Sequence, residues 1–422
     1  MRVEATLTAD TQAVLLLCGE LGQRGANGVK PLGLRQYNAL AAWLKTEGLR
    51  PGDLLTAEGQ HRLGKLQTAE VNPGRVSPLL ERGAALALIF ERWDRSGLWV
   101  ISRSDAEYPE RLKKYLGSAA PPLLYGAGSK DLLNRGGLAV VGSRDRPDED
   151  GEFARRVGEC CAGQGIAVIS GAAKGIDRDA MTGSLEAGGW ALGVLAEGLA
   201  KTATSAQYRA GLLNDRLTLI SPFDPDSRWF AYTAMERNKL LYALSDAALV
   251  VASSADSGGT WTGATEALHL GRVRVFVKST GVVAPGNQKL LRMGGIPFPE
   301  EPWSDLRRLF TPPEVKNESL FAPASPAATP VEPQPSQSPG DEKRPEPLCD
   351  AYHLVRDAML ALLKEPRAED WIADRMCVRP AQTRDWLDRG VKEGRITRLK
   401  KPVRYVALDQ PLLEFAKQPQ SS

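Results

Sequence analysis

Histidine and cysteine are scarce in this sequence, and their scarcity limits its chemistry. The 422 residues contain three histidines, His61, His269 and His353, and none stands near a clustered cysteine or acid, so we expect no metal site. The five cysteines show no CxxC spacing and are odd in number, which argues against a disulfide framework. We read them as small buried apolar residues.

Long apolar runs and nucleotide fingerprints are missing as well. No stretch of about eighteen apolar residues exists to span a membrane, and residues 1–22 lack the basic, apolar and small order of a signal peptide. We therefore expect a cytoplasmic protein with no membrane partner. No GxGxxG follows the first expected strand, and GxxxxGK[ST] occurs nowhere. This disfavours a dinucleotide-dependent dehydrogenase and a Walker-type ATPase, and we expect no cofactor.

Composition divides the chain into a large part and a small one. About a quarter of residues 311–347 are proline, with Ser, Ala and acids between them, so this segment cannot bury a core. Residues near the start, such as 34–49 and 77–97, repeat apolar side chains every three or four positions, as helices do. We predict a helical domain over 1–96, a Rossmann-like domain over 97–310, a disordered Pro-rich linker over 311–347 and a winged helix over 348–422.

Short apolar runs alternate with amphipathic helices through the middle of the chain. The alternation predicts an α/β fold with a doubly wound parallel sheet, and the unbroken apolar character of the runs fits strands covered on both faces. The runs are LAVVG (138–142), IAVIS (166–170), WALGVL (190–195), LTLI (217–220), AALVVA (247–252) and VRVFV (273–277).

Three unusual loops follow these strands. In a parallel sheet such loops share the carboxyl edge, where ligands bind, and glycines with small hydroxyls at a helix start can cradle an anion. Arginine and lysine cluster with them, which makes phosphate the expected guest. The predicted phosphate-binding residues are Gly142, Ser143, Arg144 and Arg146; Ser170, Gly171, Lys174 and Gly175; Ser257, Gly258, Gly259 and Thr260; and Arg237, Asn238 and Lys239 in the preceding helix.

The same loops contain no catalytic set. We find no Ser/His/acid or Cys/His arrangement, and we expect Asp177, Asp179 and Glu266 to cap helices or to pair with arginines. The chemistry favours binding over catalysis. Single-stranded nucleic acid also needs flat side chains for base stacking, and Trp261 in the third loop is our candidate, with core packing as the alternative.

Several blocks of the chain resemble the DNA-processing protein A family (DprA, also called Smf). They include "LAVVGSRDR", "VISGAAKGIDRDAMTGSLEAGG" and "ERNKLLYALSDAALVVASSADSGGTWTG", in family order between Ile101 and Gly281. The resemblance implies a single-stranded DNA binder, usually a homodimer, that helps to load a RecA-type recombinase on incoming DNA during transformation. It matches the family's G-S/T-R to Gly142, Ser143 and Arg144, its R-N pair to Arg237 and Asn238, and its later S-G to Ser257 and Gly258.

Two other functions stay open. The glycine-rich loop "SGGTWTGATEAL" also resembles the PGGxGTxxE loop of the lonely-guy phosphoribohydrolases, which implies a nucleotide-binding or nucleotide-hydrolysing enzyme with Glu266 as the acid. Glu266, however, lies one residue further from the paired glycines than that motif requires. The other alternative is a transcription regulator that acts on duplex DNA through the C-terminal module.

The C-terminal module reads as three amphipathic helices followed by a basic hairpin. Pro380 opens the third helix and Gly394 closes it, and the runs RITRL and RYVAL follow. This order predicts a winged helix that contacts DNA or protein. The expected DNA contacts are Gln382, Thr383 and Arg384 on the recognition helix and Arg398, Lys400 and Lys401 on the wing.

Overall fold

The structure is a computed structural model in which the chain forms two compact units, residues 1–317 and 318–422. It describes residues 7–21, 29–66, 68–228, 231–310, 359–360, 362–363, 365–376, 380–399 and 403–407. The predicted linker, 311–347, lies outside these residues. Among the described residues, no helix is both long enough and apolar enough to cross a membrane.

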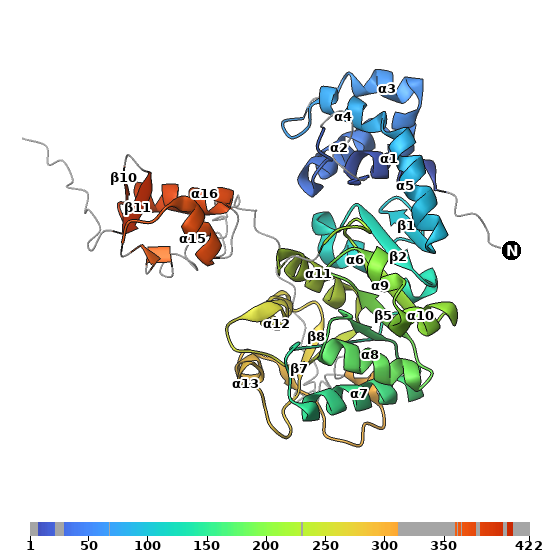
Figure 1. Ribbon diagram of the computed structural model, residues 1–422, viewed down its shortest axis with the longest axis vertical. Coiled ribbons are helices and arrows are strands. Elements are labelled where there is room, and N and C mark those ends of the chain that lie inside the picture. The colour runs from blue at the N-terminus through green and yellow to red at the C-terminus, as the bar shows by residue number, and fades with distance from the viewer. Residues whose placement is uncertain are drawn as a thin grey trace, which may run out of the picture. The chain divides into compact units, whose positions relative to one another are not determined.

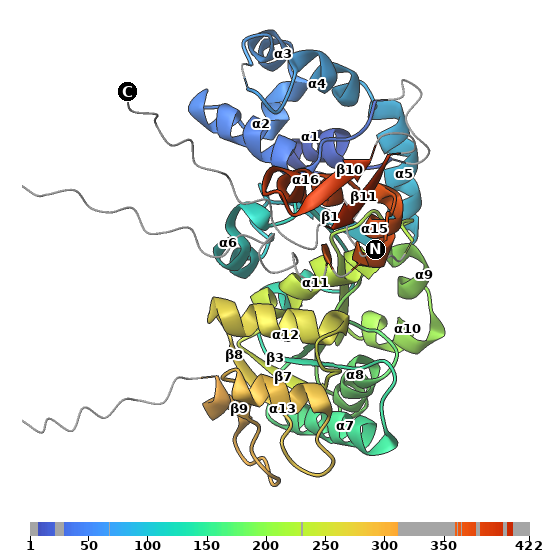
Figure 2. The same cartoon turned by 90° about the vertical axis from the view of Figure 1, so that its left-hand side faces the viewer.

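The first unit contains a nine-stranded sheet within the described part (Figures 1 and 2). Its strands, in order across the sheet, are β1 (Leu98–Ser102), β2 (Leu123–Ala127), β6 (Leu217–Ser221), β5 (Ala191–Val194), β4 (Val168–Ser170), β3 (Leu138–Gly142), β7 (Ala247–Ala252), β8 (Arg274–Val277) and β9 (Ile296–Pro297). From β3 the chain steps outward through β4, β5 and β6, then restarts at β7 on the other side of β3. The strand order therefore reverses between β3 and β7.

The predicted parallel sheet is confirmed for most of its strands, but the sheet as a whole is mixed. The strands from β6 to β9 pair in parallel, but β2 pairs antiparallel with both β6 and β1. The chain leaves β1, forms the short helix α6 (Glu110–Leu116) and comes back beside it. A return connection of this kind makes neighbouring strands antiparallel, whereas parallel neighbours need a crossover. β1 and β2 thus extend the sheet at the β6 side.

Both faces of the central strands are buried. Leu138 and Val140 of β3 point into one apolar core, whereas Ala139 and Val141 point into the other. This alternation is the period of two of a strand, and it explains why the runs are apolar throughout. Each face needs a layer of helices to cover it.

Helices from different parts of the first unit supply the two covers. Phe153 and Val157 of α7 and Met181 of α8 belong to the first core, and α7 packs against α8 (Figure 1). Leu241 of α11 and Leu290 of α13 belong to the second. The helices of this region are α7 (Asp148–Gly163), α8 (Ile176–Glu186), α9 (Leu199–Ala203), α10 (Ala206–Leu213), α11 (Ala231–Leu244), α12 (Gly258–Leu270) and α13 (Pro285–Arg292).

The N-terminal helices share the first core with the sheet. Residues such as Leu16 and Tyr37 form one continuous apolar cluster with Leu98 and Leu123 of the sheet. A polar network joins the same parts, because Thr8 and Thr11 both donate hydrogen bonds to Asp105, just after β1. The elements are α1 (Ala9–Cys18), α2 (Leu34–Thr46), η1 (Pro51–Leu55), α3 (Ala57–Leu63), α4 (Pro73–Leu80) and α5 (Gly83–Arg95). The predicted domain boundary at residue 96 stays a prediction.

The second unit has a small core of its own. Helices α15 (Glu369–Met376) and α16 (Pro380–Lys392) precede an antiparallel pair, β10 (Ile396–Leu399) and β11 (Arg404–Ala407). Ile372, Leu387 and Tyr405 meet in its interior. Most of the first helix predicted for this module lies outside the described residues, and its assignment as a winged helix stays a prediction.

Candidate nucleic-acid interface

The three loops singled out in the sequence follow three neighbouring strands. They follow β3, β4 and β7, which lie side by side in the order β4, β3, β7. Because these strands are parallel, the loops emerge at one edge, on both sides of the point where the strand order reverses. In open α/β sheets that position is the usual ligand site.

The first and second loops touch through a glycine. Gly175, the N-cap of α8, has φ of 93°, a conformation that side chains rarely adopt. A Cβ built there would lie 2.8 Å from Cα of Arg144. The amide of Ile176 donates a hydrogen bond to the carbonyl of Ser143 across the same contact, at 3.4 Å. Gly175 thereby sets Lys174 next to Arg144.

A buried acid, Asp177, forms hydrogen bonds with the backbone of both loops. Asp177 accepts hydrogen bonds from the backbone amides of Gly142, at 3.3 Å, and Gly171, at 3.1 Å. Its carboxylate lies 3.9 Å from Nη1 of Arg237, which is 5% exposed. Burial raises the pKa of Asp177 and lowers the pKa of Arg237, and the attraction between the two charges opposes both shifts.

This arrangement corrects four of the predicted phosphate contacts. The amides of Gly142 and Gly171 are already occupied by Asp177, and Arg237 lies beneath the edge because Gly171 leaves room for its guanidinium. Ser170 is fully buried and donates its hydroxyl to the carbonyl of Val140, at 2.6 Å. These residues position the loops instead of contacting a ligand directly. Asp177 also bonds loop amides where we expected it to cap its helix.

Two cations of the first two loops reach the surface. Arg144 and Lys174 are both exposed, and Ser143, the residue directly after β3, is half-buried. Arg146 differs, because its guanidinium bonds Asp179 at 2.6 Å and 2.8 Å and Asp148 at 3.0 Å. The hydrogen bond with Asp179 raises the pKa of Arg146 further. Arg144 and Lys174 are thus exposed cations of these two loops, whereas Arg146 is half-buried and bound to carboxylates.

The third loop leads into α12 through an N-terminus that favours anions. Ser257 is the N-cap, no side chain caps the first turn, and that turn contains no acid. The first turn begins with Gly258, whose φ is 89°, and Gly259, followed by Thr260. Because the two glycines have no side chains, they keep the approach to the backbone amides of this turn open. An uncapped helix start attracts negative charge through its amides and its dipole. By contrast, α7 and α8 both carry acids in their first turns.

Helix α11 supports the third loop. Asn238 donates its side-chain amide to the carbonyl of Gly259, at 2.9 Å. The exposed ammonium of Lys239 lies 3.3 Å from the carboxylate of Glu266, so this acid pairs with a lysine, where the sequence predicted an arginine or a helix cap. Trp261 is half-buried and packs against the second core. Of its two expected roles, the structure therefore favours core packing over base stacking.

The second unit offers fewer DNA contacts than the sequence predicted. Thr383 is fully buried, so it faces the small core and not a ligand. Arg384 forms a two-point ion pair with Glu369, at 2.7 Å and 3.2 Å. Arg398 is exposed on β10 and lies 5.9 Å from the ring of Tyr405. The side chain of Gln382, and Lys400 and Lys401, lie outside the described residues.

The sequence missed a cavity beside the first loop. A hollow of about 410 Å³ opens between the loops that follow β3, β7 and β8, and its lining includes Ser143, Asp145, Asp150, Ser254 and Val282. A weak signal was present, because the strand reversal between β3 and β7 predicts a crevice at that point. Residues 282–285 themselves contain no glycine and no basic residue, so nothing in their composition marked them.

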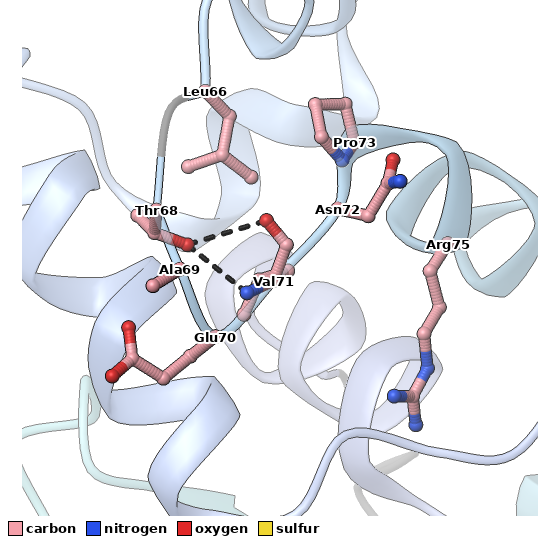
Figure 3. Close-up of a pocket in the computed structure, with 8 residues that line it drawn as sticks. All are labelled: Leu66, Thr68, Ala69, Glu70, Val71, Asn72, Pro73 and Arg75. Carbon is pink, nitrogen blue, oxygen red and sulfur yellow. Dashed lines mark hydrogen bonds between the residues drawn. The ribbon is translucent and has the colours of Figure 1, made fainter.

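A second hollow, of about 470 Å³, lies in the N-terminal helical region (Figure 3). Its polar groups are already engaged: the Thr68 hydroxyl bonds both the amide and the carbonyl of Val71, and Glu70 pairs with Arg35 at 3.2 Å. Arg75 donates to the carbonyls of Lys30 and Pro31. These contacts hold a loop in place and provide no group for chemistry.

The fold places this chain among the Rossmann-like α/β proteins. Residues 99–297 match the model of one family with this fold, described as DNA recombination-mediator protein A. Residues 99–297 therefore form a domain of this family, and similar proteins have the names DprA or Smf.

Similar proteins cover different parts of the chain. Smf of Escherichia coli (strain K12) is 32% identical over 211 residues, which are 48% of this chain and 56% of that protein. DprA of Bacillus subtilis (strain 168) is 26% identical over 214 residues, or 50% of this chain and 71% of the relative. The chain thus spans little more than half of the first relative. The solved structure of DprA from Streptococcus pneumoniae has the same fold, with a TM-score of 0.53 and 20% identity. The match covers 70% of this chain and 95% of that structure.

Proposed function

We propose that this chain binds single-stranded DNA along the carboxyl edge of its sheet. The observation that carries the proposal is the pair of exposed cations on touching loops, Arg144 and Lys174, beside the acid-free start of α12. Backbone phosphates would lie between these two side chains, with the amides of residues 258–260 as further donors. Family membership supports DNA as the anion.

The buried layer supports this proposal by holding the loops in place. Asp177 joins the ends of β3 and β4, so the backbone that carries Arg144 has little freedom to move. A preordered site loses less conformational entropy when it binds a flexible strand. We assign no catalytic step, because Glu266, the acid of the phosphoribohydrolase alternative, is paired with Lys239.

Anisotropy of labelled oligonucleotides tests the proposal. We expect the full chain to bind single strands more tightly than duplex, with affinity falling steeply as salt rises. Arg144→Ala should weaken binding and reduce the slope of log K against log salt by about 0.7, the contribution of one phosphate contact on a single strand. Lys45→Ala removes an exposed cation of α2 and is the matched control, expected to leave the slope unchanged. Equal binding of both DNA forms, insensitive to Arg144→Ala, contradicts the proposal.

We further infer that the bound strand passes to a RecA-type recombinase, in line with the family's description as a recombination mediator. The chain should then speed recombinase assembly on single-stranded DNA coated with a single-strand binding protein, and Arg144→Ala should lose that effect. We also propose that the chain acts as a homodimer, which light scattering at micromolar concentration measures directly. A monomer that still speeds assembly would remove the dimer from this scheme.

The second unit is proposed as an additional DNA contact through the exposed Arg398 of its hairpin. The full chain should lose a small part of its affinity on Arg398→Ala, about twofold to fivefold, because one surface cation contributes about 1 kcal/mol or less. Arg384→Ala should change DNA affinity less, since Glu369 already satisfies that guanidinium.

A further inference from the structure

The cavity beside the first loop differs in charge from the phosphate site next to it. Asp145 and Asp150 line it, whereas Asp148 in the first turn of α7 is paired with Arg146. The one buried cation nearby, among the described residues, is Lys278, which is bound to Asp150 at 2.7 Å and 3% exposed. Lys278 and Arg146 compensate Asp150 and Asp148, so the accessible carboxylate of Asp145 is the charge that repels phosphate here. The cavity therefore favours a neutral group that donates hydrogen bonds.

The first loop faces two different neighbours. Ser143 and Asp145 line the cavity on the β7 side. Arg144, between them, lies within electrostatic range of Asp177 and Arg237 on the β4 side. A strand whose phosphate lies at Arg144 would consequently have the cavity within about one nucleotide of it, since successive backbone units of an extended strand lie several ångströms apart.

Asp145 supplies an accessible carboxylate at the cavity. It is exposed, and within the described part of the chain its carboxylate has neither a hydrogen bond nor an ion pair. The Ser143 hydroxyl donates to the backbone carbonyl of Asp145 at 2.6 Å, which stabilises the turn. The two carboxylate oxygens can accept two parallel N–H bonds, as they do from other planar donors.

Apolar groups complete the cavity. Val282, which is 71% exposed, Val283 and Pro285 form one wall, and Ala252 and Ala255 lie at the end of β7. The volume, about 410 Å³, lies in the range of small-molecule sites. A planar ring with apolar faces and N–H donors on its edge has the matching chemistry.

We propose that this cavity holds an unpaired base of the bound strand, with guanine preferred. This inference rests on the proposed function, because the neighbouring phosphate site supplies the strand. Guanine carries two adjacent donors, N1–H and the N2 amino group, which match the two oxygens of Asp145. Thymine has one N–H between two carbonyls, and those carbonyls repel a carboxylate. The pocket therefore distinguishes guanine from thymine by the hydrogen-bond donors and acceptors that each base presents to Asp145.

The test compares two labelled oligonucleotides of about twelve nucleotides at one salt concentration: all thymidine, and the same strand with one central guanine. With the full chain, we expect the guanine strand to bind about tenfold more tightly, the gain of one good two-point contact to a base. Asp145→Asn replaces one acceptor by a donor without changing size and should reduce the ratio to about one. Glu152→Gln, an exposed acid of α7 that does not line the cavity, should keep the ratio.

The other outcomes overturn the inference in distinguishable ways. Equal affinity of wild type for both strands removes the base pocket and leaves the phosphate site standing. A guanine preference that survives Asp145→Asn places base recognition elsewhere. Failure to bind either strand overturns the proposed function, and the base pocket with it.

Discussion

The carboxylate of Asp177 lies 3.9 Å from Nη1 of Arg237, and the two side chains are only 10% and 6% exposed beneath the sheet edge. Within the described part of the chain, Nη1 and Nε of Arg237 have no hydrogen-bond partner, whereas Asp177 accepts two backbone N–H groups. The pair therefore joins three chain segments, the ends of β3 and β4 and helix α11. Its role is to position the loops that carry the exposed cations.

Arg237→Met should destabilise the protein by about 3 kcal/mol, because it leaves the buried charge of Asp177 uncompensated. Adding Asp177→Asn should recover at least about 1 kcal/mol, since the second change removes that charge while keeping an acceptor for a loop amide. Urea unfolding of wild type, both single variants and the double variant measures the coupling. Strict additivity of the two changes would show that the residues do not act as a pair.

Gly171→Ala should be destabilising by at least about 2 kcal/mol, because its Cβ would overlap the guanidinium of Arg237 and displace it from Asp177. Gly163→Ala is the matched control at the end of α7, where a Cβ meets nothing within 4 Å. That change should be neutral or stabilising, by up to about 1 kcal/mol. Thermal unfolding of the two variants compares them, and equal melting temperatures would contradict the close contact.

Arg146→Ala should reduce the affinity for single-stranded DNA less than Arg144→Ala does. Asp179 and Asp148 already satisfy the Arg146 guanidinium, so a phosphate must compete with two carboxylates for it. We expect less than a threefold loss for Arg146→Ala, against about tenfold or more for Arg144→Ala. Anisotropy titrations at matched salt measure both losses. The reverse order would mean that DNA displaces the acids.

Asp224→Asn should stabilise the protein near pH 7.5. Burial raises the pKa of Asp224 to about 6, from its ordinary value near 3.8, and one of its carboxylate oxygens has no partner among the described residues. The folded state then binds the proton more tightly than the unfolded state, so the charge costs stability as pH rises from about 4 to above 6. We expect a gain on the order of 2 kcal/mol at pH 7.5 that shrinks toward pH 4. A gain independent of pH would have another cause.

Asp105→Ala should destabilise the junction between α1 and the sheet by about 2 kcal/mol or more. The change leaves the hydroxyls of Thr8 and Thr11 and the amide of Ser102 without their acceptor. Burial opposes ionisation, but these hydrogen bonds outweigh it and hold the pKa of Asp105 below its ordinary value. The stability that these hydrogen bonds contribute is present above the pKa that Asp105 has in the unfolded chain. It is lost as pH falls through the lower pKa of the folded state. The gap between wild type and variant should therefore narrow in acid, which urea unfolding at several pH values tests.

Local pattern was sufficient to predict the strands and the loops. A run such as AALVVA has apolar side chains at every position because both faces of its strand are covered, so its identity is visible without the fold. The glycines of "SGAAKGID" likewise reveal a tight turn before a helix, and Gly175 has the positive φ that such a turn requires. Arg144 and Lys174 were predicted as basic residues of these loops and are exposed there.

Side-chain direction within those loops was not predictable. Ser170 and Arg237 have the composition of ligand contacts, yet both are buried, and Thr383 faces a core although it lies on a polar helix. Burial depends on which segments pack above and below a residue, and those segments are far away in sequence: Asp177 meets Gly142 across 35 positions. The antiparallel strands β1 and β2 were missed for a related reason, since strand pairing is a contact between segments and not a property of either one.

The sequence by itself determined the two-faced sheet, the three glycine-rich loops and their basic character, because strand period, turn chemistry and charge are properties of neighbouring residues. The tertiary structure decided which arginine is exposed and which is buried, and it formed the acidic cavity from the ends of β3, β7 and β8. Those outcomes depend on strand order, which brings distant residues together only when the sheet has formed.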